Sequence, residues 1–395
     1  MPSNISLPNQ ALLMDGVDKL DIRAYPLTLP TTADGNAAVP TGCVLVRVKA
    51  TGICGSDIHL WKHGSAVGTV VTEPYAMGHE CAGQVVAVAE DIADWKVGDR
   101  IAIKPGVACF ACEDCTRGYG NLCANMRYSG TPGVDGGCQT YRVVPVTQLV
   151  RLTPKISWTE AGLIQPLAVS IQMARQAGLR NSQKVMILGG GCIGLLLGAM
   201  AKSFGASQVV VFEKQTHRVE FAKSYCADHA FQNPPRNNPD ETTQAYATRV
   251  SKHILESVPG VGRGFDICIE ATGAEECMQM GIKLCRPGGT YIQVGMYRGK
   301  LPEINMMEVC VKQLNVRGTI RYGTNCFEEA VELIDRGLVD VKRLVSHTFD
   351  FNDSLSAFEA VYNLHDVQGK EVFKTVILHG DGDQGLESVV HGESS

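Results

Sequence analysis

Four cysteines lie close together in one short stretch of the chain, at a spacing that suits a metal ion. Cys109, Cys112, Cys115 and Cys123 form the pattern CxxCxxCxxxxxxxC. Four thiolates placed in this way match a closed tetrahedral zinc site, which contributes folding energy and leaves no open position for chemistry. The stretch around them is rich in Cys and Gly and has little periodicity, which is typical of a loop that needs a cross-link such as a metal ion to stabilise it. The pattern therefore predicts a structural zinc ion.

A second set of potential metal ligands comes from two separate motifs. GICGSDIH occupies residues 52–59, and GHECAG occupies residues 78–83. Cys54, His79 and Glu80 offer one sulfur, one nitrogen and one oxygen, the ligand inventory of a catalytic zinc with an open position for water or substrate. Taken singly, each has an ordinary alternative: a buried thiol, a core histidine, a surface glutamate. Their joint occurrence with a nucleotide-binding motif favours the metal.

That nucleotide-binding motif is a run of glycines after an apolar strand. Gly189, Gly191 and Gly194 form GxGxxG between KVMIL and an apolar helix. In this setting the three glycines permit a tight turn, close approach of a pyrophosphate, and close packing of helix on strand, while the helix N-terminus offers free N–H groups to phosphates. Glu213 ends the next strand, where a carboxylate accepts hydrogen bonds from ribose hydroxyls and repels the extra phosphate of NADP. We therefore expect NAD, although a solvated strand-end charge is the alternative for Glu213.

The elements that must position these residues are of two kinds. From residue 43 to 99, short β-rich runs alternate with turns, which indicates an irregular β domain. From residue 184, β-branched runs alternate with helical segments, which predicts crossover units and a parallel sheet covered by helices on both faces. Between them, Ser157 and Glu160 have the spacing of a capping box and predict the start of a helix. The polar segment 233–244 is expected to be a surface loop.

After about residue 318 this alternation stops, and the remaining patterns are expected to return to the first domain. We therefore predict an α/β protein in which residues 1–168 and 320–395 form a β-rich, zinc-binding catalytic domain. Residues 169–319 should form a six-stranded, doubly wound Rossmann domain that binds NAD. The tail from residue 380 has the small, polar composition of a frayed terminus.

Length and composition exclude several classes of protein. At 395 residues the chain exceeds one ordinary core, and its 19% charged and 45% hydrophobic residues are typical of globular proteins. The net charge of −5 and the lack of a basic stripe argue against nucleic-acid or membrane partners. No signal peptide is evident, and the longest apolar stretch, 193–201, is too short to cross a bilayer. A soluble, cytoplasmic protein is expected, in which clustered cysteines bind metal rather than form disulfides.

Taken together, these motifs resemble the zinc-containing branch of the medium-chain dehydrogenase/reductase family over nearly the whole chain. Their order along the chain matches as well. GTIRYG at 318–323 and QPLAVSI at 165–171 are most similar to the polyol dehydrogenases that act on sorbitol, xylitol and arabinitol. The resemblance implies a GroES-like catalytic domain, two zinc ions and one NAD per chain, a homotetramer, and oxidation of a secondary alcohol of a polyol to a ketose.

The resemblance also implies roles for individual residues. Those expected at the catalytic zinc and the substrate are Cys54, Ser56, Asp57, His59, His79, Glu80, Gln165, Arg321 and Tyr322. Asp57 would fix the ring of His79, Ser56 and His59 would carry the hydroxyl proton outward, and Arg321 and Tyr322 would hold further substrate hydroxyls. Positions that match the cofactor lining are Ile193, Glu213, Arg218, Val294, Gly295, Met296, Thr319, Ile320 and Arg321.

Two positions depart from the polyol dehydrogenase pattern. The family usually has Glu where this chain has Gln165, and a neutral amide can hydrogen-bond but cannot act as a base or supply charge to zinc. Leu60 stands where sorbitol and xylitol dehydrogenases tend to have an aromatic residue, which implies a reshaped substrate pocket. The substrate therefore stays open: another secondary alcohol, such as a diol or an amino alcohol, and a non-catalytic NAD-binding role are the alternatives.

Overall fold

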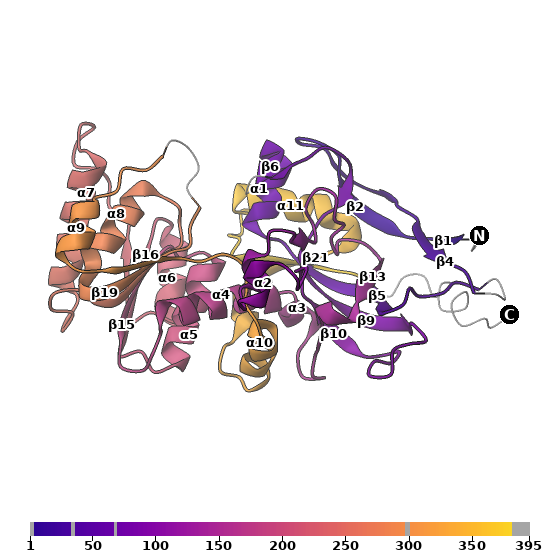
Figure 1. Ribbon diagram of the computed structural model, residues 1–395. Helices are drawn as coiled ribbons and strands as arrows, with labels where there is room; N and C mark the ends of the chain where they lie inside the picture. The colour runs from indigo at the N-terminus through magenta and orange to yellow at the C-terminus, as the bar shows by residue number, and fades with distance from the viewer. Residues whose placement is uncertain (1–3, 33–35, 67–68, 297–300, 381–395) are drawn as a thin grey trace. The chain divides into compact units, whose positions relative to one another are not determined.

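The computed structural model places the chain in two compact units, each with its own core (Figure 1). The residues that it describes are 4–32, 36–66, 69–296 and 301–380. The first unit takes the described parts of Met1–Gln165, Ala330–Asp335 and Val341–Ser395, and the second takes those of Pro166–Glu329 and Arg336–Asp340. The tail expected to be frayed lies outside the described residues, apart from its first residue.

The second unit is built on a six-stranded parallel sheet. Its strands are β15 (Lys184–Leu188), β16 (Gln208–Glu213), β17 (His229–Gln232), β18 (Phe265–Glu270), β19 (Cys285–Gln293) and β20 (Asn315–Gly318). They lie in the order β17-β16-β15-β18-β19-β20, and every neighbouring pair is parallel. This is the doubly wound Rossmann order, in which the first strand along the chain lies in the middle of the sheet. The predicted fold class is confirmed for this unit.

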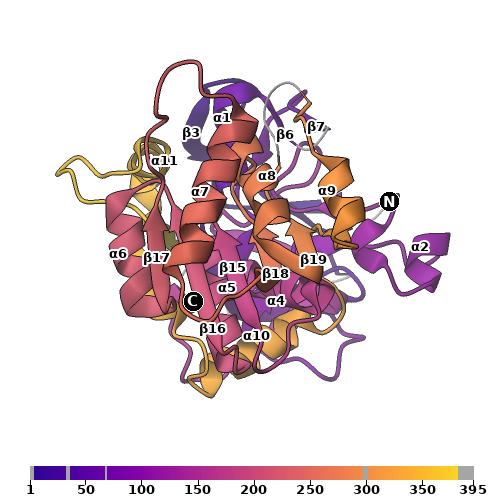
Figure 2. The same ribbon diagram turned by 90° about the vertical axis from the view of Figure 1, so that its left-hand side faces the viewer.

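Helices cover both faces of this sheet (Figures 1 and 2). They are α4 (Ile164–Ala177), α5 (Cys192–Ser203), α6 (Thr216–Tyr225), α7 (Thr243–Ser257), α8 (Glu275–Leu284) and α9 (Met306–Val311). Tyr246, Val250 and Ile254 recur at helical spacing on α7 and pack into one buried cluster with residues of β15, β16 and β18. The stretch between β17 and α7 forms neither helix nor strand, as its polar composition predicts.

The first unit contains a seven-stranded, mostly antiparallel sheet. Along the sheet its strands are β14 (Leu149–Arg151), β10 (Arg100–Ile103), β9 (Glu80–Val88), β5 (Cys43–Gly52), β22 (Lys374–Leu378) and β21 (Val345–Asp350), and β13 (Tyr141–Pro145) also pairs with β5. β5 and β9 are buried along almost their whole length. The two C-terminal strands complete this sheet, since β22 pairs with β5 through Val376 and Gly52. Chain segments from opposite ends of the sequence therefore meet in one core.

Smaller elements surround the seven-stranded sheet. The small sheets comprise β1 (Asn4–Leu7) with β4 (Leu27–Pro30), β3 (Leu20–Ala24) with β2 (Gln10–Met14) and β8 (Tyr75–Ala76), β6 (Ser65–Ala66) with β7 (Thr69–Val70), and β11 (Gly106–Val107) with β12 (Arg127–Tyr128). The helices are α1 (Gly55–His63), α2 (Glu113–Thr116), α3 (Trp158–Ala161) and α11 (Ser354–Asn363), while α10 (Cys326–Asp335) contributes residues to both units. Ser157 caps α3, because its Oγ accepts the N–H of Glu160 at 3.2 Å, so the predicted capping box is confirmed.

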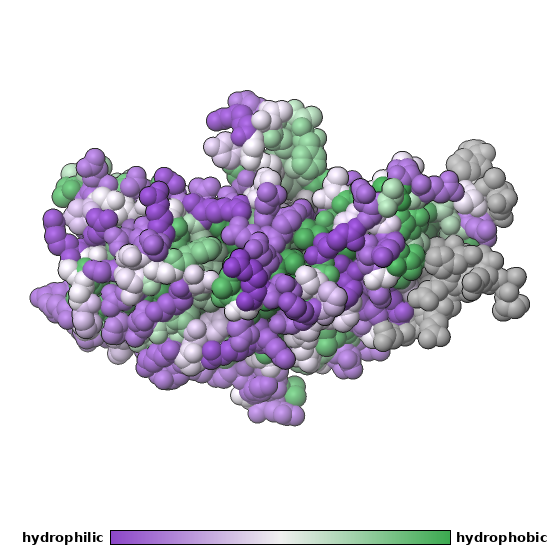
Figure 3. Space-filling model, turned by 90° about the horizontal axis from the view of Figure 1, so that it is seen from below, coloured by the Kyte–Doolittle hydropathy of each residue, from purple (hydrophilic) through white to green (hydrophobic). Residues whose placement is uncertain are grey.

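Hydrophilic residues cover most of the face shown in Figure 3, and apolar residues there are scattered between them. The large apolar side chains instead fill the cores of the two units. Across the described part of the chain, no helix has both the length and the apolar character needed to span a membrane.

Candidate active site

Three of the expected metal ligands meet where two buried strands of the first unit lie side by side. Cys54 follows β5 as the N-cap of α1, His79 precedes β9, and Glu80 is the first residue of β9. Because Gly52 on β5 faces Glu80 on β9, the two distant motifs are brought together. The sulfur, a ring nitrogen and a carboxylate oxygen lie within 4.8 Å of one another. This donor set and spacing fit a zinc ion held by three protein ligands.

Asp57 connects two of these ligands from its position in the first turn of α1. Its Oδ2 accepts the backbone N–H of Cys54 at 2.9 Å, and its Oδ1 lies 3.1 Å from Nδ1 of His79. A carboxylate on Nδ1 fixes the ring and leaves Nε2 as the nitrogen that can bind a metal. Burial lowers the pKa of His79, but the charge and hydrogen bond of Asp57 raise it more, so that the pKa lies well above its ordinary value. The geometry therefore holds the His79 ring in a single orientation.

Glu80 has a second partner, which the sequence analysis missed. The Lys374 ammonium group forms an ion pair with Oε2 of Glu80 and also donates to the carbonyl of Ile53 at 2.7 Å. Both side chains are almost completely buried, at 1% and 4% exposure for Glu80 and Lys374. Gly52 is required beside them, because a Cβ there would lie 2.3 Å from the Glu80 carboxylate. A single lysine in the otherwise apolar strand KTVIL was the sequence signal for this contact.

Gln165, the main departure from the family pattern, lies in the first turn of α4 with a tyrosine as its partner. Its Nε2 donates to the hydroxyl of Tyr128 at 3.0 Å. The Tyr128 ring in turn lies 5.8 Å from the ring of His79, measured between centroids. The amide is thereby linked to the metal-ligand group through one aromatic side chain. Tyr128 was not predicted, because a tyrosine on a two-residue strand has no periodicity or spacing in the sequence that would single it out.

Three further residues of interest lie on α1, which begins directly after Cys54. Ser56 and His59 are half-buried and one helical turn apart, and Leu60 is buried. The His59 ring packs against that of His63, with centroids 4.5 Å apart. The helix therefore holds both expected proton-carrying groups on the element that starts at a metal ligand.

The four-cysteine pattern also forms a compact cluster in the first unit. The sulfur atoms of Cys109, Cys112, Cys115 and Cys123 all lie within 4.8 Å of one another. Backbone N–H groups of Cys109 and Cys112 donate to the sulfurs of Cys123 and Cys109, each at 3.3 Å. Hydrogen bonds from the backbone at Ala111 and Cys112 lower the pKa of the Cys109 thiol to about 6. Burial, together with the neighbouring thiols, raises the pKa of Cys115 to about 12, so the backbone does not favour thiolate at every position. The four sulfur donors in this arrangement nevertheless fit a closed tetrahedral zinc site.

The predicted nucleotide turn joins β15 to α5 in the second unit. Gly189 has a φ of +116°, which glycine adopts readily, and a Cβ on Gly194 would lie 1.9 Å from the Gly189 carbonyl oxygen. Gly191, the N-cap of α5, differs from both: a Cβ there would meet no atom within 4 Å. Packing within the protein thus requires glycine at the first and third positions only. At the second position, open space lies in front of the helix N-terminus, which suits a pyrophosphate.

Glu213 ties this turn to the next strand. Its Oε2 accepts the N–H of Gly190 at 2.7 Å, and its Oε1 accepts the N–H groups of Lys214 and Gln215 at 2.6 and 2.9 Å. A carboxylate has about four lone-pair sites, so one acceptor position on Oε2 is left for a ribose hydroxyl. The carboxylate is therefore more than a solvated charge at a strand end.

The other expected cofactor positions follow the same edge of the sheet, because parallel strands all end there. Val294, Gly295 and Met296 come after β19, whereas Thr319, Ile320, Arg321 and Tyr322 come after β20; Ile193 and Arg218 lie in the first turns of α5 and α6. Arg321 has a φ of +56°, and the Tyr322 ring packs edge-on against Phe327 with centroids 4.7 Å apart.

One buried carboxylate at this edge was missed. Glu270 ends β18, is completely buried, and accepts the N–H of Gly273 at 3.0 Å and the Nε2 of Gln293 at 2.7 Å. Burial raises the pKa of its carboxyl group. Glu270 thereby fixes the loops that follow β18 and β19. Its sequence signal was an acidic residue ending the apolar strand of GFDICIEATG.

The chain is similar to known zinc-binding dehydrogenases over most of its length. Two family models match: the alcohol dehydrogenase GroES-like domain over residues 40–154, and zinc-binding dehydrogenase over residues 192–336. D-xylulose reductase A of Aspergillus oryzae is 37% identical over 94% of this chain and 97% of its own. L-idonate 5-dehydrogenase of Escherichia coli has a TM-score of 0.79 at 25% identity, covering 95% of this chain and 99% of that one. A structure from Sinorhizobium meliloti, described as a zinc-binding dehydrogenase bound to NADP, has a TM-score of 0.79 at 25% identity, covering 94% and 99%.

The two family models cover parts of both units, and the first of them spans the residues of both candidate metal sites. Identity of 37% over nearly the full length of both chains shows common descent. The chain therefore belongs to the zinc-containing medium-chain dehydrogenase/reductase family, in the branch of oxidoreductases that act on polyols with zinc and NAD.

Proposed function

We propose that this chain oxidises a secondary alcohol of a polyol, of the xylitol, L-arabinitol or sorbitol type, to a ketose while NAD is reduced. The observation that carries the proposal is the Cys54, His79 and Glu80 group, with donor atoms within 4.8 Å, in a chain that also forms a GxGxxG turn. The relatives named D-xylulose reductase and L-idonate 5-dehydrogenase support a polyol-like substrate.

The first unit would hold both metals and the second unit the dinucleotide. When bound, zinc supplies a Lewis acid that lowers the pKa of the substrate hydroxyl, and NAD accepts the hydride. Cys54, His79 and Glu80 would hold that metal, and Asp57 keeps the His79 ring in the orientation that leaves Nε2 available to it. Lys374 offsets the charge of the buried Glu80 carboxylate.

Polar groups of the chain orient the substrate and remove its proton. Arg321 and Tyr322 bind hydroxyl groups beyond the reacting carbon, and Ser56 with His59 conducts the released proton outward. The positive φ of Arg321 supports its role, because strained backbone of this kind in a non-glycine residue often occurs at functional sites. Gln165 and Tyr128 form a neutral wall of the site, linked by the hydrogen bond between them.

Glu213 is the residue that favours NAD over NADP. Its carboxylate is held by three backbone N–H groups, so it cannot easily swing away from a 2′-phosphate. A structural relative is bound to NADP, so the preference for NAD is tested against NADP in the first experiment.

Turnover on a substrate panel tests the proposed reaction. Zinc-loaded protein should reduce NAD with xylitol, L-arabinitol or sorbitol in preference to butane-2,3-diol or threonine, and should prefer NAD to NADP, as followed by NADH absorbance. A chelator and Cys54→Ser should each abolish turnover, whereas Cys310→Ser, at an exposed cysteine of α9, should keep it. Turnover that survives both chelation and Cys54→Ser would contradict the zinc mechanism, and turnover confined to the diol or threonine would contradict a polyol substrate.

Removing the charge of Asp57 tests its control of the metal site. Asp57→Asn should lower the affinity of the catalytic site for zinc and lower turnover by about 10- to 100-fold, because loss of the partner of a metal-binding histidine typically has effects of this size. Chelator competition followed by metal analysis measures this, and the four-cysteine site should keep its zinc. Asp91→Asn is the matched control, because Asp91 also accepts a backbone N–H, that of Gly42 at 3.0 Å, on the surface. Equal zinc retention by both variants would show that Asp57 does not support the metal.

Restoring a carboxylate at position 165 tests whether this residue acts on the metal. Gln165→Glu adds negative charge near the site, which opposes deprotonation, so the pH profile of turnover should shift to higher pH. Tyr128→Phe removes the hydrogen-bond partner without changing charge and should alter KM while leaving the pH profile in place. Identical pH profiles for Gln165→Glu and the unchanged protein would mean that residue 165 does not influence the metal.

We further propose that the enzyme is a homo-oligomer, a tetramer by resemblance, assembled in part through the open edge of the Rossmann sheet. In the described chain β20 pairs with β19 alone, and its four residues are exposed. Met307 and Val311 on the preceding helix are 70% and 80% exposed. An exposed edge strand beside apolar side chains is a template for pairing with a second copy.

Light scattering measures this assembly. The unchanged protein should scatter as an oligomer, and Val311→Asp should reduce its mass by placing a charge in the apolar contact. Val367→Asp, at a valine that is 98% exposed in the first unit, should not reduce it. A monomeric unchanged protein would refute the proposal.

A cytoplasmic location is also proposed. All 15 cysteines are free of disulfides, and seven of them are accounted for by the two metal groups. Free thiols and thiolate metal sites persist in a reducing compartment.

A further inference from the structure

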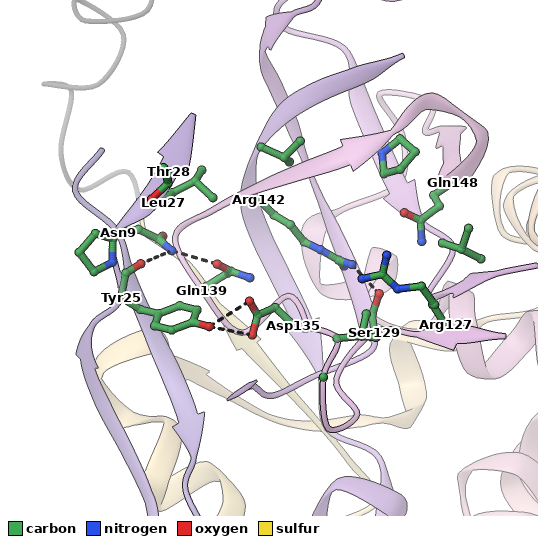
Figure 4. Close-up of a pocket in the computed structure, with 16 residues that line it drawn as sticks. Asn9, Tyr25, Leu27, Thr28, Arg127, Ser129, Asp135, Gln139, Arg142 and Gln148 are labelled. Carbon is green, nitrogen blue, oxygen red and sulfur yellow. Dashed lines mark hydrogen bonds between the residues drawn. The ribbon is translucent and has the colours of Figure 1, made fainter. Parts of the chain in front are cut away.

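A polar cavity in the first unit lies apart from the residues assigned to zinc, NAD or substrate (Figure 4). Its volume is about 490 Å³, within the usual range for small-molecule sites. Arg127, Ser129 and Arg142 line one end, and Asn9, Tyr25 and Asp135 line the other. The cavity therefore has a basic end and an acidic end.

Arg142 at the basic end is a buried cation without a carboxylate partner. The side chain is only 9% exposed, and its Nη2 donates to Ser129 Oγ. Its Nη1 is buried and makes no hydrogen bond within the described chain. Burial lowers the pKa of this guanidinium, which means that the surroundings disfavour its charge. A buried charge of this kind is costly unless an opposite charge is close by.

Arg127 brings a second positive charge to the same end. It comes from β12, and its guanidinium points toward that of Arg142 (Figure 4). No described carboxylate forms an ion pair with either arginine. Arg127 is exposed and its charge is solvated, whereas Arg142 is buried, and an anion between the two guanidinium groups would pair with both and offset the desolvation cost of Arg142. The planar fork of arginine suits carboxylate and phosphate oxygens in particular.

The charge of Asp135 acts to raise the pKa of Arg142, but Asp135 forms no ion pair with that guanidinium, and its carboxylate is hydrogen-bonded at the other end of the cavity. Its carboxylate accepts the hydroxyl of Tyr25 at 3.2 Å and the N–H of Ala76 at 2.8 Å. Both oxygens keep lone pairs that can accept further hydrogen bonds. Hydroxyl groups of a ligand would therefore find acceptors at the acidic end while its anionic group lies on the arginines.

From this arrangement we propose that the cavity binds a small phosphate ester of a polyhydroxy compound. The phosphate contacts Arg127 and Arg142, and the hydroxyls point toward Asp135. The site is separate from the proposed catalytic function, since none of these three residues belongs to the metal or cofactor groups. Arg127 and Tyr128 are adjacent on β12. Because neighbouring residues of a strand face opposite sides, Arg127 faces the cavity while Tyr128 faces the candidate active site.

Isothermal titration calorimetry of the zinc-loaded protein, saturated with NAD so that the pyrophosphate site is filled, tests the proposal. Ribose 5-phosphate is the probe, and ribose is its uncharged counterpart. Ribose 5-phosphate should bind, and ribose should bind far more weakly. Arg127→Gln should lower the affinity for ribose 5-phosphate by about tenfold or more, because charged hydrogen bonds are lost. Arg263→Gln is the matched control, because it removes one exposed arginine charge from the second unit and should change nothing.

Amide hydrogen exchange then locates the ligand without a substitution at the buried Arg142, whose replacement would put folding at risk. With the unchanged protein, ribose 5-phosphate should slow amide exchange in β13, the strand that contains Arg142, and not in α5 behind the nucleotide turn. Absence of binding at millimolar probe, equal binding by the Arg127→Gln and Arg263→Gln variants, or protection confined to α5 would each overturn the proposal.

Discussion

The ion pair between Glu80 and Lys374 is almost completely shielded from solvent, and three segments of the first unit meet around it. Glu80 begins β9, Lys374 begins β22, and the Ile53 carbonyl that also accepts from Lys374 lies at the end of β5. Removing one member of such a pair typically costs about 3 to 5 kcal/mol, because the other charge is left buried and unpaired. The position of Glu80 in the candidate metal site therefore depends on a strand contributed by a much later part of the chain.

Asp57 adds a second constraint of the same kind. One carboxylate completes the start of α1 through the Cys54 N–H and also orients the His79 ring. The first turn of α1 and the orientation of the His79 ring consequently cannot change independently. Cys54 is the N-cap of α1, and Asp57 in the same turn orients His79, so a shift in the first turn of α1 would move two of the three donor atoms of the candidate site.

Much of this arrangement could be predicted from the sequence, because short-range patterns carried it. The glycine turn and the four-cysteine run each fall within one short stretch of the chain, and Glu213 ends the strand that follows the glycine turn, so spacing along the chain indicated their chemistry. The alternation of strand and helix predicted the six-stranded parallel sheet. What could not be predicted were contacts between residues with no shared motif, such as Lys374 with Glu80 and Tyr128 with Gln165. Those pairs depend on how distant strands pack, which periodicity does not report.

The late return of the chain to its first sheet also has a consequence for biosynthesis. Residues up to β14 emerge from the ribosome long before β22, and β5 cannot gain its β22 neighbour until the chain has been made as far as Leu378. Until then Glu80 lacks the Lys374 ammonium group that pairs with it in the folded unit. Since N-terminal parts of a protein generally fold first during synthesis, the second unit can complete its sheet while the first still waits for its last strands. A chain terminated between β20 and β22 would thus contain a finished nucleotide-binding sheet and an unfinished metal site.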